Sequence, residues 1–172
     1  ANTTNTNKYS FTSEVISQSI RPVLINSAFS GQSAPTFGLF RGVLNSGVNA
    51  MRWHYADDTY TTHQFSEVQA NKSRMASVGT ATAAYFTTSH YQTKHTFSSG
   101  AEYDTISGAG YNYFERSGTN NSTIAVIQGG DNGSTIINHR YKMLFSAETY
   151  TYDVAMAYVR RGSASFGNAT KA

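Results

Sequence analysis

The chain has no cysteine, only two prolines and one tryptophan among its 172 residues. Without cysteine there can be no disulfide framework and no thiolate-bound zinc or iron–sulfur site. Charged residues make up 13% of the chain, the net charge is +3, and the basic residues are scattered. Nucleic-acid binding needs a basic stripe with stacking aromatics, so this composition argues against a nucleic-acid partner. Because no run of 18 apolar residues occurs, we expect no membrane insertion.

Aromatic and small polar residues dominate instead. Tyrosine occurs 12 times and phenylalanine 10 times, and Thr, Ser, Asn and Gly are abundant. β-branched and aromatic residues fit pleated, half-buried strands, whereas Gly, Asn and Ser fill turns. A chain of 172 residues has the length of one domain. We therefore predict a single all-β domain over residues 1–172.

Alternating apolar residues mark several strands. In the run 51–55, Trp53 and Tyr55 share one face, and the same alternation recurs over residues 141–145. A period of two is the signature of a half-buried strand. From this alternation we expect Trp53, Tyr55 and Phe145 to belong to the core.

The strand-like runs repeat along the chain. A first family of runs, each with an acidic residue near its end, starts at spacings of 44, 43 and 46 residues. Its members are Lys8–Val15, Arg52–Thr59, His95–Thr105 and Tyr141–Thr149. A second family begins near an arginine: Arg21–Leu24, Arg74–Val78, Arg116–Gly118 and Arg161–Phe166.

Small polar links follow the second family, at Gly31–Ala34, Gly79–Thr82, Asn120–Thr123 and Gly167–Thr170. A third family comes after three of these links, at Phe37–Gly42, Ala84–Ser89 and Ala125–Gly130. With a variable strand between the first and second families, the unit holds three or four strands. Periods of 40 to 50 residues with this content are typical of propeller blades. We predict a small propeller-like array of about four short-stranded repeats; the alternative is an antiparallel β-sandwich or jelly roll.

Two stretches resemble a known family. Arg116–Gly130 resembles the repeats of kelch-like β-propeller proteins, in which a strand ending in Gly-Gly follows an Arg-led strand. Arg160–Lys171 resembles the matching segment in kelch-like arrays of tailed-phage structural proteins. The resemblance is strongest over residues 116–170. It implies a non-enzymatic component of a phage virion, such as a decoration, fibre or tail accessory protein. It also implies localisation in the virion; secretion is the alternative.

The repeat set is incomplete: there are four first-family runs, four second-family runs and three third-family runs. A propeller must close its ring to cover its sheet edges. Either the N-terminal segment Ala1–Thr6 or a neighbouring chain would fill the gap, unless the repeats form an open sandwich. We expect assembly contacts with other virion proteins or copies of itself, and a homo-oligomer.

No catalytic constellation is recognisable. The five histidines lack the spacing of a helical zinc site; His90 and His95 could meet across a hairpin, but a third ligand is not evident. Asp57 and Asp58 would point to opposite faces of a strand unless the chain turns there, so we interpret them as an acidic turn. We therefore predict no enzyme activity, no catalytic residues, no metal and no cofactor.

Tyrosines near turns or on expected solvent faces are the candidate binding residues. These are Tyr60, Tyr91, Tyr111 and Tyr113. Exposed rings of this kind anchor proteins and stack on sugars. The alternative function is accordingly a lectin-like module with several shallow aromatic sites that binds cell-surface glycans by multivalency.

Overall fold

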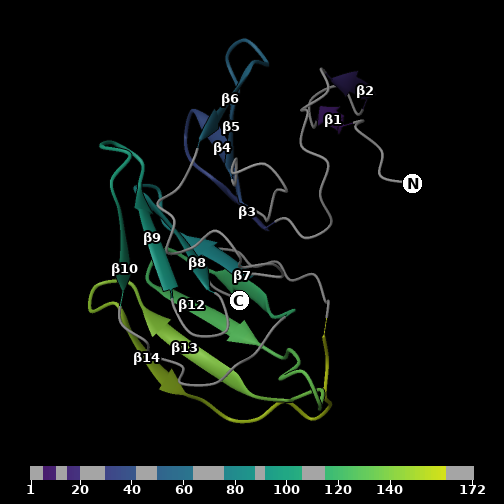
Figure 1. Ribbon diagram of the computed structural model, residues 1–172, viewed down its shortest axis with the longest axis vertical. Helices are drawn as coiled ribbons and strands as arrows, with labels where there is room; N and C mark the ends of the chain where they lie inside the picture. Colours follow the sequence, from purple (N-terminus) through teal and green to yellow (C-terminus); the bar gives the residue numbers. More distant parts are fainter. Residues whose placement is uncertain are drawn as a thin grey trace.

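The computed structural model describes residues 6–10, 15–19, 30–41, 50–63, 76–87, 92–105 and 115–161. Every regular element in these ranges is a β-strand, which confirms the all-β prediction. No helix in the described part of the chain has the length and apolar character that crossing a membrane requires. The strands form one two-stranded hairpin and three four-stranded sheets (Figure 1).

Each sheet consists of strands that follow one another along the chain. The hairpin pairs β1 (Thr6–Ser10) with β2 (Val15–Ser19). The first four-stranded sheet contains β3 (Ser30–Ser33), β4 (Phe37–Arg41), β5 (Ala50–His54) and β6 (Tyr60–His63). The second contains β7 (Ala76–Gly79), β8 (Ala83–Thr87), β9 (Gln92–Thr96) and β10 (Glu102–Thr105). The third contains β11 (Ser117–Asn120), β12 (Ile124–Gln128), β13 (Arg140–Leu144) and β14 (Thr149–Tyr152). All pairings are antiparallel.

The three sheets are joined through their first strands, because β7 contacts both β3 and β11. These strands are made of small residues, as close approach requires. A Cβ atom at Gly118 would lie 2.7 Å from Val78 Cγ1 and 2.9 Å from the Ser77 carbonyl oxygen. A Cβ atom at Gly79 would lie 2.6 Å from Gln32 Cγ. Glycine is thus required at both positions by the approach of the neighbouring strand.

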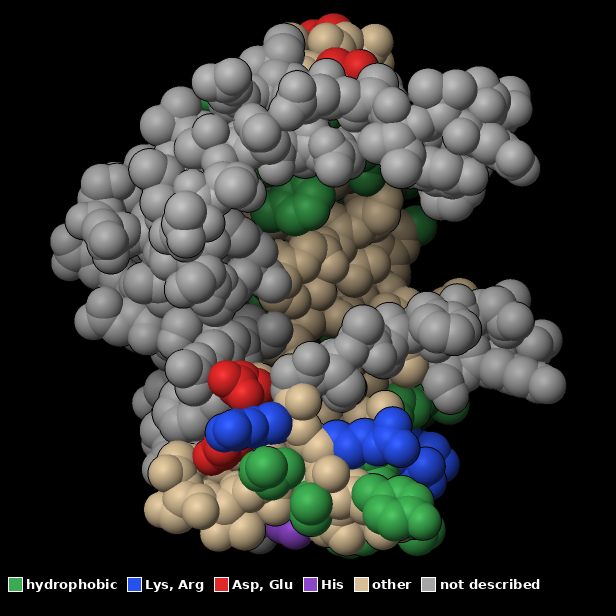
Figure 2. Space-filling view, turned by 90° about the vertical axis from the view of Figure 1, so that its right-hand side faces the viewer, with side chains coloured by type: hydrophobic (Ala, Val, Ile, Leu, Met, Phe, Trp, Pro, Cys, Tyr) green, Lys and Arg blue, Asp and Glu red, His purple; other side chains and the backbone are tan. Residues whose placement is uncertain are grey.

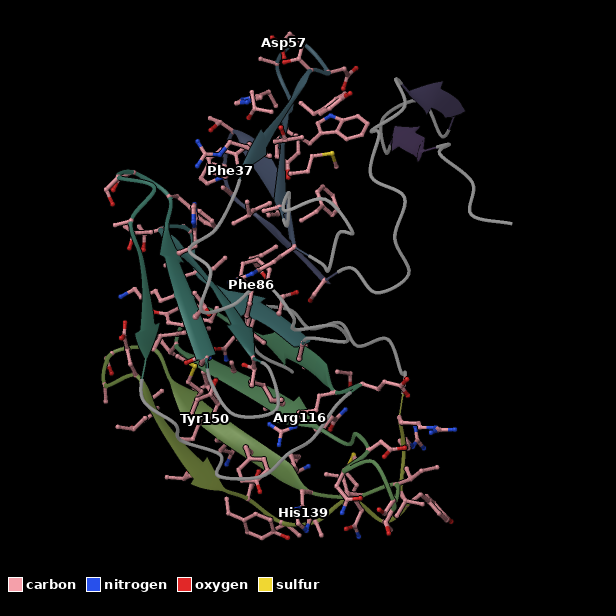
Figure 3. All side chains as sticks on the ribbon, in the orientation of Figure 1. Phe37, Asp57, Phe86, Arg116, His139 and Tyr150 are labelled. Carbon is pink, nitrogen blue, oxygen red and sulfur yellow. The ribbon has the colours of Figure 1, made fainter. Side chains whose placement is uncertain are left out.

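Two hydrophobic clusters fill the spaces between successive sheets. Phe37 and Leu39 of β4 belong to one cluster with Phe86 of β8, between the first and second sheets. Figure 3 labels Phe37 and Phe86 on these two sheets. Tyr85 of β8 meets Ile127 of β12 and neighbouring apolar residues between the second and third sheets. Alternate residues of one strand therefore serve opposite neighbours, so the middle sheet is covered on both faces.

The turns repeat as closely as the strands. In each four-stranded sheet, the aromatic residue after the third strand donates its backbone N–H to a threonine carbonyl in the turn between the first two strands. The three pairs are Tyr55 to Thr36 at 3.1 Å, Phe97 to Thr82 at 2.9 Å and Phe145 to Thr123 at 3.1 Å. Three residues later the backbone adopts positive φ, at Asp58 (56°), Gly100 (67°) and Glu148 (53°). The internal repeat is therefore present in backbone conformation as well as in sequence.

After β14, residues 153–161 run back along the loop 129–139. The Gly130 N–H donates to the Arg160 carbonyl at 2.7 Å, and the Arg161 guanidinium lies 2.7 Å from Asp131 Oδ2. Figure 2 shows charged side chains beside apolar ones at this lower end of the molecule.

The third-family runs coincide with β4, β8 and β12, as predicted. The first-family runs Arg52–Thr59 and Tyr141–Thr149 proved to be a strand followed by a turn that contains or adjoins their acidic residue. In His95–Thr105 the acidic residues Glu102 and Asp104 belong instead to β10. Residues 11–14 of the run Lys8–Val15 lie outside the described residues. The residues 31–34 were predicted to be a link, which is wrong, because Ser30–Ser33 forms β3. The run Arg21–Leu24 lies outside the described residues. The count of repeats is likewise not tested, because the segments 1–5 and 162–172 also lie outside.

The three residues predicted to belong to the core differ in their burial. Trp53 is buried and Phe145 packs against the second cluster. Tyr55 is 45% exposed, so its prediction as a core residue is wrong. The physical reason is that the strand ends at His54, and the period-two rule does not continue into the turn that follows.

Candidate functional site

Of the four predicted binding tyrosines, the structure describes one. Tyr60 begins β6, pairs with Trp53 of β5 and is partly buried. Tyr91, Tyr111 and Tyr113 lie outside the described residues. The structure therefore does not test the prediction that these four tyrosines form a binding site.

Asp57 and Asp58, in the turn between β5 and β6, accept hydrogen bonds from neighbouring residues. Asp57 Oδ1 accepts hydrogen bonds from the Thr59 N–H at 3.1 Å and the Thr59 hydroxyl at 2.8 Å. These hydrogen bonds hold the pKa of the Asp57 carboxyl below its usual value. Asp58 accepts from the Trp53 indole at 3.4 Å. Within the described ranges no three His, Cys, Asp or Glu residues gather as a metal site would require; His90 lies outside them.

A cation occupies the same place in each third strand. The third residue is Arg52 in β5, Lys94 in β9 and Lys142 in β13. In the hairpin, the third residue of β1 is Lys8. Each of the first three cations pairs with the middle residue of the preceding strand, and these partners are Leu39, Tyr85 and Val126. The register therefore sets the cations at the centre of equivalent sheet faces.

Arg52 reaches the following sheet. Its guanidinium lies over the ring of Phe37, with Cζ 4.2 Å from the centroid, and Nη2 is 3.4 Å from His95 Nε2 on β9. A ring face attracts a cation, and a guanidinium presents a flat surface to it. Arg52 thus spans the first and second sheets.

Lys94 does the same between the second and third sheets. Its ammonium lies 5.6 Å from the Tyr85 ring centroid and forms an ion pair with Glu148, in the turn before β14. The Tyr85 hydroxyl donates to Glu148 Oε1 at 3.0 Å. Burial, and then the hydrogen bond to the carboxylate, raise the pKa of Tyr85 to about 12. Lys94 and Glu148 are only 20% and 26% exposed, so this pair is shielded from solvent.

Behind this ion pair lies a small polar cluster around Tyr150. The Thr87 hydroxyl is 3.2 Å from the Tyr150 hydroxyl, and the Gln92 amide contacts the same oxygen. Figure 3 shows where Tyr150 lies. Burial is the main cause that raises the Tyr150 pKa. The contact between the second and third sheets therefore combines an apolar cluster with buried, hydrogen-bonded polar groups.

Lys142 stands on the corresponding face of the third sheet. We call this surface the outer face of β11–β14: it consists of Ile124, Val126, Gln128, Arg140, Lys142 and Leu144, which alternate with the buried residues of β12 and β13. Leu144 is 46% exposed and the Lys142 side chain 50% exposed. The Lys142 ammonium is 3.7 Å from Asp153 Oδ2. This face thus carries an exposed cation and aliphatic side chains where the other sheets have covered ones.

Sequence reasoning missed the repeated cation although its signal was present. The first family was aligned on its acidic ends, which set its third and fourth members to begin at His95 and Tyr141. The strand register instead aligns Lys94 and Lys142 with Arg52. Alignment on the cation would have found it.

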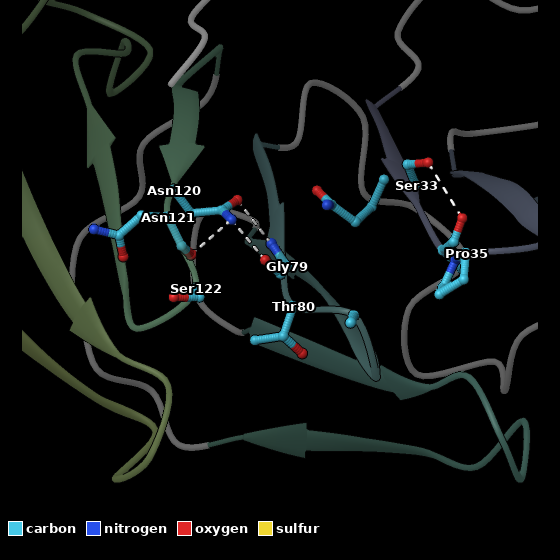
Figure 4. Close-up of a pocket in the computed structure, with 10 residues that line it drawn as sticks. Ser33, Pro35, Gly79, Thr80, Asn120, Asn121 and Ser122 are labelled. Atoms are coloured by element: carbon cyan, nitrogen blue, oxygen red, sulfur yellow. Dashed lines mark hydrogen bonds between the residues drawn. The ribbon is translucent and has the colours of Figure 1, made fainter. Parts of the chain in front are cut away.

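A cleft of about 420 Å³ lies where the turns between the first and second strands of the three sheets converge (Figure 4). Its lining comes from residues 32–35, 79–81 and 120–122. Asn120 ties two of the walls together: its amide donates to the Gly79 carbonyl at 2.6 Å and accepts from the Gly79 N–H at 3.0 Å. The ten described lining residues are uncharged, and most of them have a hydroxyl or amide group in the side chain.

The cleft was also missed from the sequence, where its residues were taken only as links between strands. The signal was the recurrence of small polar residues at the same point of each repeat. Equivalent turns of sheets joined through their first strands must lie at the same end of the molecule.

Comparison with known proteins adds no identity to this geometry: no family model matches the chain, and no curated protein matches it.

Proposed function

We propose that the three sheets are blades of a propeller-like array, and that the chain is a non-enzymatic structural and interaction protein of a tailed-phage virion, acting through sheet-to-sheet assembly contacts. Three features of the described strands support blades over a jelly roll: each sheet is made of consecutive strands, the first strands lie side by side, and the sheets exchange no strand. The kelch-like resemblance of residues 116–170 supports the virion assignment.

One observation carries the assembly proposal: Lys142 is equivalent to Arg52 and Lys94, whose partners lie in the following sheet, yet it is half exposed. Its ion pair with Asp153 is a surface pair of the kind that contributes little to stability. Exposed Leu144 lies beside it on the same face. Both features suit a surface that another sheet covers.

The occupant that we propose is the hairpin repeat of a second copy of this chain. Lys94 pairs with Glu148, which ends the turn Phe145–Glu148. The hairpin repeat carries the sequence Phe11-Thr12-Ser13-Glu14, and its Lys8 occupies the position of the other cations. Glu14 occupies the same position in the hairpin repeat as Glu148 does in the third sheet. We therefore expect Glu14 to pair with Lys142 as Glu148 pairs with Lys94. The contact would thus repeat at the outer face the ion pair that Lys94 and Glu148 form between the second and third sheets.

A charge exchange tests this pairing. Sedimentation velocity over a wide concentration range should show self-association of the wild type, and its loss in Lys142→Glu and in Glu14→Lys. The double variant should associate again, because the pair is restored with reversed polarity. Arg160→Glu is the control, since it makes the same charge change at an exposed residue that is not one of the outer-face residues.

The proposal fails if the wild type stays monomeric at every concentration, or if Arg160→Glu dissociates the assembly as strongly as Lys142→Glu. A monomer whose thermal stability falls in each single variant and recovers in the double variant would place Glu14 against Lys142 within one chain. That outcome would replace assembly by internal ring closure.

A further inference from the structure

We propose that the cleft at the converging turns binds a neutral carbohydrate. The site does not depend on the assembly contact, because its lining residues 32–35, 79–81 and 120–122 are all outside the outer face of β11–β14. Its volume of about 420 Å³ lies within the range of small-molecule sites, about 300–1,000 Å³.

The chemistry of the lining selects the ligand class. Phosphate and carboxylate ligands are bound in proteins by arginine or lysine, and divalent cations by carboxylates. None of the described residues that line this cleft is charged. Hydroxyl and amide groups offer both donors and acceptors, which is what the hydroxyl groups of a saccharide require. The ligand is therefore uncharged and rich in hydroxyl groups.

Several of these groups are available to a ligand. The Gln32 side-chain amide and the Ser122 hydroxyl make no hydrogen bond to any other described residue. The Asn121 side-chain oxygen, Oδ1, is committed to its own turn: it accepts from the N–H groups of Thr123 at 2.9 Å and Ile124 at 2.8 Å. Within the described chain the Asn121 side-chain nitrogen, Nδ2, donates to no other residue, and it remains as a donor.

The walls are held in place before any ligand arrives. Each turn is closed by a backbone hydrogen bond, from Ala34 to Phe37 at 2.8 Å, from Thr80 to Ala83 at 2.9 Å and from Asn121 to Ile124 at 3.0 Å. The two hydrogen bonds between Asn120 and Gly79 fix the second wall against the third (Figure 4). Rigid walls reduce the entropy that binding must overcome.

An aromatic ring stands at one rim. Tyr55 is 45% exposed, and its hydroxyl lies 2.7 Å from the Ser33 hydroxyl, which lines the cleft. Its equivalents Phe97 and Phe145 pack into the clusters between sheets. Tyr55 thus places a half-exposed aromatic ring beside the polar lining, near the exposed Pro35. An aromatic ring next to hydroxyl and amide groups is a combination that the apolar and polar faces of a sugar ring can use.

An NMR titration of the full chain tests the proposal, with maltotriose and chitotriose as neutral probes, sialyllactose as an anionic probe and a Ser/Asn-rich peptide as a competitor class. A neutral trisaccharide should shift the backbone signals of Thr80 and Ser122 and the side-chain NH₂ signals of Gln32. The Ser122→Trp variant fills the cleft and should weaken binding at least about ten-fold, which is a large effect for one side chain. Ser134→Trp is the matched control, because Ser134 is an exposed turn serine outside the cleft.

Three results would overturn the site: no binding of either neutral trisaccharide by a chain whose spectrum is well dispersed, shifts confined to residues away from the cleft, or equal loss of affinity in Ser134→Trp. Tighter binding of the peptide or of sialyllactose at the cleft would overturn the assignment to a neutral saccharide. Lys142→Glu should bind as the wild type does, which separates this test from that of the assembly contact.

Discussion

At the scale of single residues, the contact between the second and third sheets rests on a shared carboxylate. Glu148 accepts a hydrogen bond from Tyr85 and an ion pair from Lys94, and the Tyr85 side chain is only 3% exposed. A buried partner left without its hydrogen bond costs more than a surface pair contributes. We therefore expect these three side chains to contribute more to the stability of the interface than a surface ion pair does.

The Tyr85→Phe variant removes the hydroxyl and keeps the ring. We expect the free energy of unfolding to fall by about 1 kcal/mol, the usual contribution of one intramolecular hydrogen bond. Glu148→Gln should cost more, because it leaves the shielded Lys94 ammonium without its anion. Urea denaturation of both single variants and the double variant measures the coupling, which should differ clearly from zero. Additive losses would contradict a shared carboxylate.

The raised pKa of Tyr85 also makes a pH prediction. Folding raises the pKa of this phenol from 10.0 to about 12, so the unfolded chain loses its proton first as the pH rises. The stabilisation is present below pH 10 and is lost between pH 10 and about 12. Denaturation across this range should show a fall in stability that is smaller in Tyr85→Phe. An identical pH profile for the variant would contradict the assignment.

At the scale of elements, the turn after each third strand is the most regular part of the repeat. Asp58, Gly100 and Glu148 all have positive φ, although only one of them is glycine. A left-handed conformation costs a residue with a Cβ roughly 1–2 kcal/mol. At Asp58 the hydrogen bond from Trp53, and at Glu148 the contacts with Lys94 and Tyr85, offset this cost.

Gly100→Ala isolates the backbone effect, because a Cβ at Gly100 would have no neighbour within 4 Å. We expect a loss of about 1 kcal/mol in the free energy of unfolding from the φ constraint alone. Gly100→Asn should lose less, since asparagine tolerates the left-handed region better. Thermal or urea denaturation ranks the three proteins. Equal stability of the alanine variant and the wild type would show that this turn relaxes to another conformation.

The sequence predicted the strands best where alternation was strong and the chain was buried, as at β4, β8 and β12. It failed at Tyr55 and at β3, and the reasons differ. Tyr55 continues the alternation of β5 into a turn where the rule no longer applies. β3 lies against β7, and its residues Ser30–Ser33 are mostly small and polar. A strand of this composition cannot be told from a link between strands by sequence alone.

At the scale of the whole molecule, the candidate sites were less predictable than the fold. The cleft depends on residues 32–35, 79–81 and 120–122, which meet only when three sheets are joined through their first strands. The cation of the outer face could have been predicted from the spacing of Arg52, Lys94 and Lys142 in the sequence. That Lys142 is exposed and Lys94 is covered could not be predicted, because it depends on which sheet follows.

The order of the sheets also predicts how the molecule opens. Phe86 lies between the first and second sheets, and Ile127 between the second and third. In arrays where each unit contacts only its neighbours, stability is a sum of unit and interface terms. Loss of one interface should therefore expose the two sheets that share it and spare the third.

Ile127→Val removes one methyl group from the later interface and should cost about 0.5–1.5 kcal/mol. In hydrogen exchange followed by mass spectrometry, peptides from β7–β10 and β11–β14 should exchange faster, while those from β3–β6 keep their wild-type protection. Phe86→Leu should give the opposite pattern, with β3–β6 and β7–β10 affected and β12–β13 preserved. Because both side chains are fully buried, solvent exposure does not separate the two variants; only the interface does. Uniform acceleration over all three sheets in both variants would mean that the described sheets unfold as one cooperative unit.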